Sequence, residues 1–227
     1  MRFSPILVVG GEPNSIFSEI FIKSINKTKF KRPIILIYSL NLLNKQMKQL
    51  KLEKDIKVLD PYKIKKYNLN NKSINLINVN YNQNKPFQKI SKKTKSFISE
   101  CFTLAFELMK KEKITKLING PISKKNFLEN KFLGMTEYIS DYFSVPNNCM
   151  LIFNKNLSVC PVTTHMPLKL VSKNISQKII YDKIILINKF YKNYFNTKPK
   201  IAVLGLNPHC ESIHKYNEDE KIINPLV

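Results

Sequence analysis

Residues 5–50 read PILVVGGEPNSIFSEIFIKSINKTKFKRPIILIYSLNLLNKQMKQL, and this stretch decides the fold class. The runs at 5–9 and 34–38 consist almost entirely of aliphatic and β-branched residues, which is typical of buried strands. The segments at 15–25 and 40–50 repeat apolar residues at helical spacing. A strand–helix–strand–helix order predicts an α/β fold with a mainly parallel sheet.

The same alternation continues toward the carboxyl end of the chain. Residues 51–88 are rich in Asn and Lys and contain only short strand candidates, at 56–58 and 74–79. Beyond them the pattern predicts further helices and strands. We expect helices at 90–110, 124–143 (with a break at Gly134) and 176–195, and strands at 114–118, 150–153, 157–162 and 200–206.

The composition is that of a globular protein with an unusual charge. The chain has 227 residues, 43% of them hydrophobic, which is enough for one large domain or two small ones. Lys and Arg number 38 against 16 Asp and Glu, a net charge of +22, so a basic nucleic-acid-binding protein is one alternative. Only Arg2 and Arg32 are arginines, and the lysines are spread along the chain among Asn and Ile, which argues against a nucleic-acid partner. The charge could instead steer an anionic substrate.

The cysteines and the amino-terminal sequence indicate a cytoplasmic protein. The four cysteines form no CxxC pair, which is typical of reduced thiols. The apolar run Ile6 to Val9 is too short for the hydrophobic part of a signal peptide. No stretch approaches the roughly 20 apolar residues of a transmembrane helix, so no membrane partner is expected.

Two histidine motifs carry the candidate chemistry. Thr163-Thr164-His165-Met166-Pro167-Leu168 and Gly205-Leu206-Asn207-Pro208-His209 each follow an apolar, β-branched run. A strand that ends in a His presents the imidazole at the carboxyl edge of a sheet, where α/β folds bind ligands. Two such imidazoles can share a divalent metal, although a zinc site needs three or four ligands. His214 lies in a polar stretch and is interpreted as a surface residue.

Six motifs, taken together, resemble a known family. They are Gly11-Glu12-Pro13-Asn14-Ser15-Ile16, Asn119-Gly120-Pro121-Ile122-Ser123-Lys124, Gly134-Met135-Thr136-Glu137, the two histidine motifs, and Ile222-Ile223-Asn224-Pro225. In this order they are similar to the motifs of 4-hydroxythreonine-4-phosphate dehydrogenases of pyridoxine biosynthesis. The resemblance runs from one end of the chain to the other.

The resemblance implies a two-domain α/β/α architecture similar to isocitrate and isopropylmalate dehydrogenases, incomplete at the C-terminus in this chain. Residues 1–120 would form the first α/β domain, completed by a later segment, and 121–227 an incomplete second α/β domain. The family's subunits pair as homodimers. The alternatives are an incomplete record of an active enzyme, an inactive truncated relic, and the basic nucleic-acid-binding protein.

The implied activity is an oxidation coupled to loss of CO2. The family oxidises 4-phosphohydroxy-L-threonine, a small phosphorylated amino acid, with NAD and a divalent metal (Zn, Mg or Co), and decarboxylation then gives 3-amino-2-oxopropyl phosphate for pyridoxal 5'-phosphate biosynthesis. The sequence contains no Gly-rich dinucleotide fingerprint, and this family does not use one.

The resemblance also implies roles for individual residues. His165 and His209 match two of three metal-binding histidines, and the third would lie beyond Val227. Thr136 and Lys124 match residues that contact the substrate, although Thr136 could instead be a helix N-cap. Met135 departs from the family, which has a substrate-binding His there, and a thioether cannot donate a hydrogen bond as an imidazole can.

Overall fold

The computed structural model describes residues 4–129, 131–206, 217 and 219–226. The chain divides into two compact units, Met1–Lys131 and Phe132–Val227. This division falls after the boundary expected at residues 120 and 121, because helix α4 (Lys124–Phe127) contacts helix α3 of the first unit. The expected domain limits stay a prediction.

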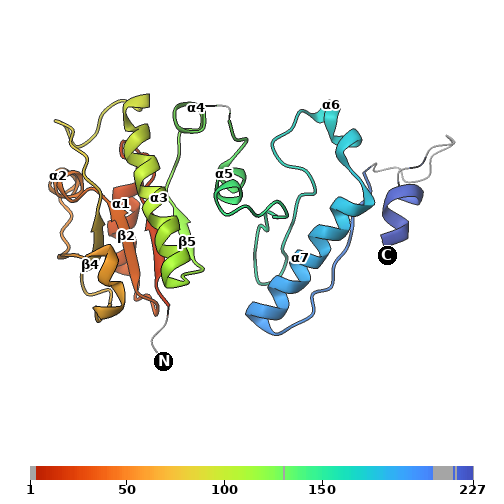
Figure 1. Cartoon of the computed structure of the whole chain (residues 1–227), viewed down its shortest axis with the longest axis horizontal. Helices are drawn as coiled ribbons and strands as arrows, with labels where there is room; N and C mark the ends of the chain where they lie inside the picture. Colours follow the sequence, from red (N-terminus) through yellow and green to blue (C-terminus); the bar gives the residue numbers. More distant parts are fainter. Residues whose placement is uncertain (1–3, 130, 207–216, 218, 227) are drawn as a thin grey trace. The chain divides into compact units, whose positions relative to one another are not determined.

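The first unit is built on one parallel sheet of five strands, drawn in Figure 1. The strand order is β3-β4-β2-β1-β5, and every neighbouring pair is parallel. The predicted parallel α/β fold is therefore confirmed. The strands are β1 (Ile6–Val9), β2 (Ile34–Tyr38), β3 (Ile56–Val58), β4 (Ile74–Asn78) and β5 (Leu117–Asn119).

The central strands are buried on both faces. All five residues of β2 are buried, and Leu7 and Val9 of β1 are fully inaccessible to solvent. A continuous apolar run without polar alternation suits such a strand, because helices cover both sides of a parallel sheet. The edge strand β5 is more open, with Ile118 53% exposed.

Three long helices pack around this sheet. Helix α1 contacts α2, whereas α3 contacts β1 and β2 and lies in front of the sheet in Figure 1. The Ser39 side chain caps α2 by accepting a hydrogen bond from Leu42 N, as expected for a serine N-cap. The helices are α1 (Phe17–Lys27), α2 (Leu40–Leu50) and α3 (Lys95–Glu112), with short 3-10 helices η1 (Pro61–Lys66) and η2 (Lys92–Thr94).

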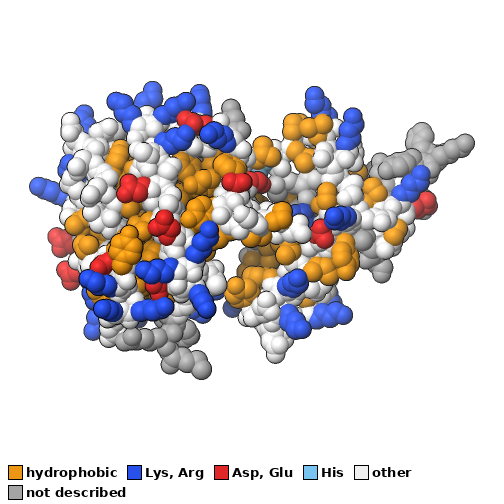
Figure 2. Space-filling view, in the orientation of Figure 1, with side chains coloured by type: hydrophobic (Ala, Val, Ile, Leu, Met, Phe, Trp, Pro, Cys, Tyr) orange, Lys and Arg blue, Asp and Glu red, His pale blue; other side chains and the backbone are white. Residues whose placement is uncertain are grey.

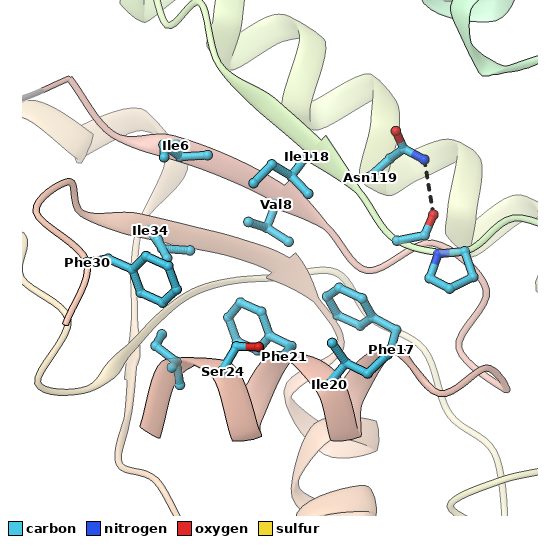
Figure 3. A pocket seen from close by; sticks show the side chains of 13 residues that line it. Ile6, Val8, Phe17, Ile20, Phe21, Ser24, Phe30, Ile34, Ile118 and Asn119 are labelled. Atoms are coloured by element: carbon cyan, nitrogen blue, oxygen red, sulfur yellow. Dashed lines mark hydrogen bonds between the residues drawn. The ribbon is translucent and has the colours of Figure 1, made fainter. Parts of the chain in front are cut away.

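An apolar cavity of about 370 Å3 lies between α1 and the sheet (Figure 3). Phe17, Ile20 and Phe21 of α1 line it opposite strand residues such as Val8 and Ile34. Its lining includes two polar side chains, Ser24 and Asn119, and the Asn119 amide donates to Gly120 O at 3.1 Å. Because no titratable side chain lines this cavity, it offers no acid, base or metal ligand.

The second unit contains helices and loops in its described part, and three expected strands are absent there. Residues 150–153 and 157–162 form only one antiparallel bridge, Ile152 with Val159, and 200–206 form no strand. Ile152 is 61% exposed and Val159 54% exposed, so the strand propensity of these runs has no sheet to pack against. The prediction that His165 lies at the carboxyl edge of a sheet is therefore wrong for the described residues.

The helices of the second unit follow the sequence pattern more closely. The expected break at Gly134 is confirmed, and Ser176 caps α7 by accepting from Ile179 N at 3.4 Å. Every helix in the described ranges is too short or too polar for a membrane span. The helical elements are α5 (Met135–Tyr142), α6 (Leu168–Val171), η3 (Ser172–Asn174), α7 (Gln177–Phe195), η4 (Asp219–Ile223) and η5 (Asn224–Leu226).

Candidate functional site

The two glycine turns of the first unit lie against each other where β1 and β5 end. Glu12 N donates a hydrogen bond to Pro121 O at 2.8 Å. Gly11 has a φ of +71°, and a β-carbon on it would lie 2.5 Å from Pro121 O. A β-carbon on Gly120 would lie 2.1 Å from Gly10 O. Glycine is therefore required on both sides of this contact, at the sheet edge where α/β folds bind ligands.

A buried carboxylate holds the first turn in place. Glu12 is 1% exposed and accepts hydrogen bonds from Asn14 N at 3.2 Å and Thr94 Oγ1 at 2.9 Å. Asn14 Oδ1 in turn accepts from Gln83 Nε2 at 2.9 Å. A buried carboxylate without partners would be strongly destabilising, so these donors explain why it is tolerated. Its contacts indicate that Glu12 stiffens the turn.

Two sequence motifs converge in the second unit, at Gly134. A β-carbon on Gly134 would lie 2.8 Å from Glu137 Oε2 and 3.1 Å from His165 Nε2. The Thr164 hydroxyl donates to Glu137 Oε1 at 3.4 Å. The imidazole and the carboxylate therefore both pack closely against Gly134, and the Thr164 hydroxyl is bonded to the second oxygen of that carboxylate.

The backbone at His165 is strained and one carboxylate oxygen is unpaired. His165 has a φ of +57°, a left-handed conformation that is uncommon outside glycine and often marks functional sites. Glu137 Oε2 is buried and has no hydrogen-bond partner among the described residues. An unsatisfied buried carboxylate oxygen suggests a bound partner such as water or a cation.

The predicted site residues fall in both units. His165 and Thr136 belong to the second unit, where Thr136 is half-buried at the second position of α5. The alternative that Thr136 is a helix N-cap is wrong, because Gly134 occupies that position. Lys124 is exposed and begins α4 in the first unit. His209 and His214 lie outside the described residues.

Glu137 is the residue of this cluster for which the sequence predicted no role. It was part of the quoted motif Gly134-Met135-Thr136-Glu137, three positions after the helix N-cap. That spacing is typical of a capping box, in which the Glu side chain accepts from the N-cap backbone N–H. The structure instead pairs Glu137 with Thr164, which only the tertiary fold could reveal.

The donor chemistry at Gly134 fits a divalent cation. One imidazole nitrogen and one carboxylate oxygen lie against the same glycine, and these are ligand types that zinc accepts. The described residues contain no group of three or more His, Cys, Asp or Glu side chains placed to hold a metal. Completing the ligand set would need His209 or a further residue outside the described ranges.

Positive charge does not gather at one place on the visible surface. Figure 2 shows Lys and Arg side chains spread over both units, with acidic and apolar side chains between them. Such a surface lacks the basic patch or stripe that marks a nucleic-acid interface. The view therefore gives no support to the nucleic-acid-binding alternative.

Comparison with known proteins identifies the family. The family model described as "Pyridoxal phosphate biosynthetic protein PdxA" matches residues 29–227. The chain belongs to the PdxA family. It is 36% identical over 223 residues to a 4-hydroxythreonine-4-phosphate dehydrogenase from Sulfurihydrogenibium sp. (strain YO3AOP1), and the match covers 96% of this chain and 67% of that relative. The family predicted from the motifs is confirmed.

Solved structures of 4-hydroxythreonine-4-phosphate dehydrogenases share the fold. The 4-hydroxythreonine-4-phosphate dehydrogenase from Klebsiella pneumoniae matches with a TM-score of 0.84 at 20% identity, covering 99% of this chain and 71% of that one. The enzyme from Burkholderia phymatum matches with a TM-score of 0.80 at 22% identity, covering all of this chain and 70% of that one. These matches confirm the dehydrogenase-like α/β fold class. These relatives are named as dehydrogenases, and the match covers 67% of the Sulfurihydrogenibium relative and 71% and 70% of the two solved structures.

Proposed function

We propose that this chain forms part of an NAD-dependent and divalent-metal-dependent dehydrogenase. The reaction is oxidation of 4-phosphohydroxy-L-threonine at its C3 hydroxyl, followed by decarboxylation to 3-amino-2-oxopropyl phosphate. The observation that carries this proposal is the convergence of two family motifs on one glycine, since His165 Nε2 and Glu137 Oε2 both lie close to Gly134. The PdxA family match over residues 29–227 supports it.

Metal binding is assigned to His165 and His209. When bound, a divalent cation would supply Lewis acidity that favours ionisation of the substrate alcohol. His165 is exposed and keeps its imidazole accessible, whereas the neighbouring Thr164 hydroxyl is engaged by Glu137. The protein's contribution here is to hold the imidazole in one orientation.

Substrate binding is assigned to Thr136 and Lys124. The Thr136 hydroxyl is a hydrogen-bond donor and acceptor on the first turn of α5, next to Glu137. Lys124 is an exposed cation that suits a phosphate or carboxylate. Met135, between the N-cap and Thr136, offers only a thioether, so Thr136 would carry the hydrogen bonding on this turn.

The nicotinamide cofactor, the homodimer and the location follow from the family. Dehydrogenases transfer hydride to a nicotinamide, and we propose NAD. We propose a homodimer in the cytoplasm, in line with the free thiols of Cys101, Cys149 and Cys160. The net charge of +22 would attract a phosphorylated substrate and speed its encounter with the protein.

A coupled assay tests the proposal. NADH formation is followed at 340 nm with 4-phosphohydroxy-L-threonine, with Mg2+, Zn2+ or Co2+, and with EDTA. In the whole dehydrogenase of which this chain forms part, we expect a rate that requires both substrate and metal and is lost in His165→Asn, whose side chain tolerates the left-handed backbone. Lys57→Gln, far along the chain on β3, is the control. A metal-independent rate, or full activity in His165→Asn, would contradict the assignment.

A chain that binds metal but forms no NADH would favour the truncated relic. In that case, substitution of His165 would still lower the metal affinity, although the chain forms no NADH. Adding duplex DNA or RNA at physiological salt tests the nucleic-acid alternative, which predicts salt-sensitive binding. The proposed function predicts no binding beyond weak, sequence-independent attraction.

A further inference from the structure

We propose that Glu137 is a positioning residue for His165 and the cation it binds, with both side chains packed against Gly134. The inference rests on the proposed function, because it concerns the metal-binding role of His165. It adds to that function a carboxylate that steadies the imidazole and a glycine that lets both side chains approach its backbone.

The geometry places both groups around one point. Glu137 Oε2 and His165 Nε2 lie 2.8 Å and 3.1 Å from the position of a β-carbon on Gly134. No hydrogen bond joins the two side chains in the structure of the described residues. The two polar atoms therefore lie against the same glycine without a hydrogen bond between them.

The carboxylate is held in place but not satisfied. Thr164 Oγ1 donates to Glu137 Oε1 at 3.4 Å, which fixes one oxygen next to the residue that precedes His165. The other oxygen, Oε2, is buried without a partner among the described residues. Leaving a buried polar atom unpaired costs about 1–3 kcal/mol, and more for a charge. Such a cost is sustained where a ligand supplies the missing contact.

A purely structural role for Glu137 leaves this arrangement unexplained. As the third residue of α5 it could accept from the N-cap backbone N–H of Gly134 in a capping box. The Gly134 cap position has no side-chain hydrogen bond, and Oε2 accepts none. A favourable interaction between the Glu137 carboxylate and the N-terminal end of the helix dipole does not require Oε2 to be buried. The burial of an unpaired Oε2 against Gly134, which His165 also contacts, is therefore the feature that requires a function.

The expected effect follows from how histidine ligands are supported in metal sites. A metal-binding imidazole is usually oriented by a carboxylate, a carbonyl or water, and loss of that partner lowers metal affinity about 10- to 100-fold. His165 has a left-handed backbone, and its imidazole has no hydrogen-bond partner among the described residues. Glu137 also supplies a negative charge near the cation.

Histidine-ring NMR provides a direct readout, because the chain contains only three histidines. The full 227-residue chain is titrated with CoCl2, and His165→Asn identifies the His165 ring signal. The test variants are Glu137→Gln, which keeps the shape but removes the charge, and Gly134→Ala, whose methyl group would displace both side chains. Asp141→Asn, an exposed acidic residue on the same helix, is the matched control. Circular dichroism verifies that each variant folds.

We expect the Co2+ affinity measured at the His165 ring to fall about 10-fold or more in Glu137→Gln and to stay unchanged in Asp141→Asn. Gly134→Ala should weaken Co2+ binding to a similar extent if this variant folds. If Gly134→Ala does not fold, the result for Glu137→Gln alone tests the proposal. Equal affinities in wild type and Glu137→Gln would overturn the role of Glu137 while leaving the metal role of His165 intact. An unperturbed His165 ring in wild type would overturn both.

Discussion

Thr94 Oγ1 donates a hydrogen bond to Glu12 Oε2 at 2.9 Å, across 82 positions of sequence. The bond joins the turn after β1 to the residue before α3, and both partners are nearly inaccessible to solvent, at 2% and 1% exposure. It therefore fixes the Gly11–Glu12 turn against the body of the first unit. Glu12 N in this turn also donates a hydrogen bond to Pro121 O. The buried bond to Thr94 therefore helps to hold the loops that follow β1 and β5 in place.

Removing that hydroxyl should destabilise the first unit. Thr94→Val keeps the shape but leaves the buried Glu12 carboxylate with one donor fewer. A hydrogen bond to a charged group contributes about 1.5–3 kcal/mol, so we expect the free energy of unfolding to fall by about 2 kcal/mol. Urea denaturation measures it, with exposed Thr103→Val on α3 as the control. A loss equal to that of the control would show that Glu12 is satisfied without Thr94.

Tyr38 should make the first unit sensitive to alkali. Burial raises the pKa of the Tyr38 phenol well above the value of about 10 for an exposed tyrosine. The folded state thus favours the protonated phenol, and this contribution is fully present below about pH 10 and lost as pH rises beyond it. We expect the free energy of unfolding to fall by up to about 1.4 kcal/mol per pH unit from this group.

Tyr38→Phe isolates that contribution. The variant loses the hydrogen bonds of the hydroxyl to Gln46 Oε1 at 3.1 Å and Pro13 O at 3.3 Å, so it should be less stable at neutral pH. Its stability should nevertheless fall less steeply above pH 10 than that of wild type. Urea titrations at stepped pH values measure the slopes, and exposed Tyr62→Phe is the control. Parallel slopes in wild type and Tyr38→Phe would contradict the prediction.

The left-handed backbone at His165 should lower the stability of the protein, while the imidazole at this position serves metal binding. With a φ of +57°, a residue with a β-carbon is strained there by roughly 1–2 kcal/mol, and glycine is not. We expect His165→Gly to be more stable than His165→Ala by about 1 kcal/mol, while both lose metal binding. Thermal unfolding measures the difference between these two variants. Equal stabilities would mean that the backbone relaxes once the imidazole is gone.

Local sequence determined much of the first unit and the family. The apolar run at 34–38 became β2 with the predicted bounds, because a strand buried on both faces leaves a continuous apolar signal, and 40–50 became α2 through its helical periodicity. The short candidate at 56–58 became β3 with the predicted bounds, although Lys57 and Val58 are exposed. In α1 the helix was predicted but its buried face was not: Phe17 and Phe21 pack inward, whereas Ile16 and Ile20 are exposed. The ordered motifs were enough to predict the PdxA family.

Tertiary structure decided what depends on neighbours distant in sequence. Strand order placed β1 between β2 and β5, and the apolar runs at 150–153 and 157–162 formed one bridge, since a strand requires a partner as well as propensity. Glu137 was visible in the sequence only as part of a motif. Glu137 lies in the first turn of a helix and His165 in a loop 28 positions later, and the two side chains meet at Gly134. They can approach this residue because glycine has no β-carbon.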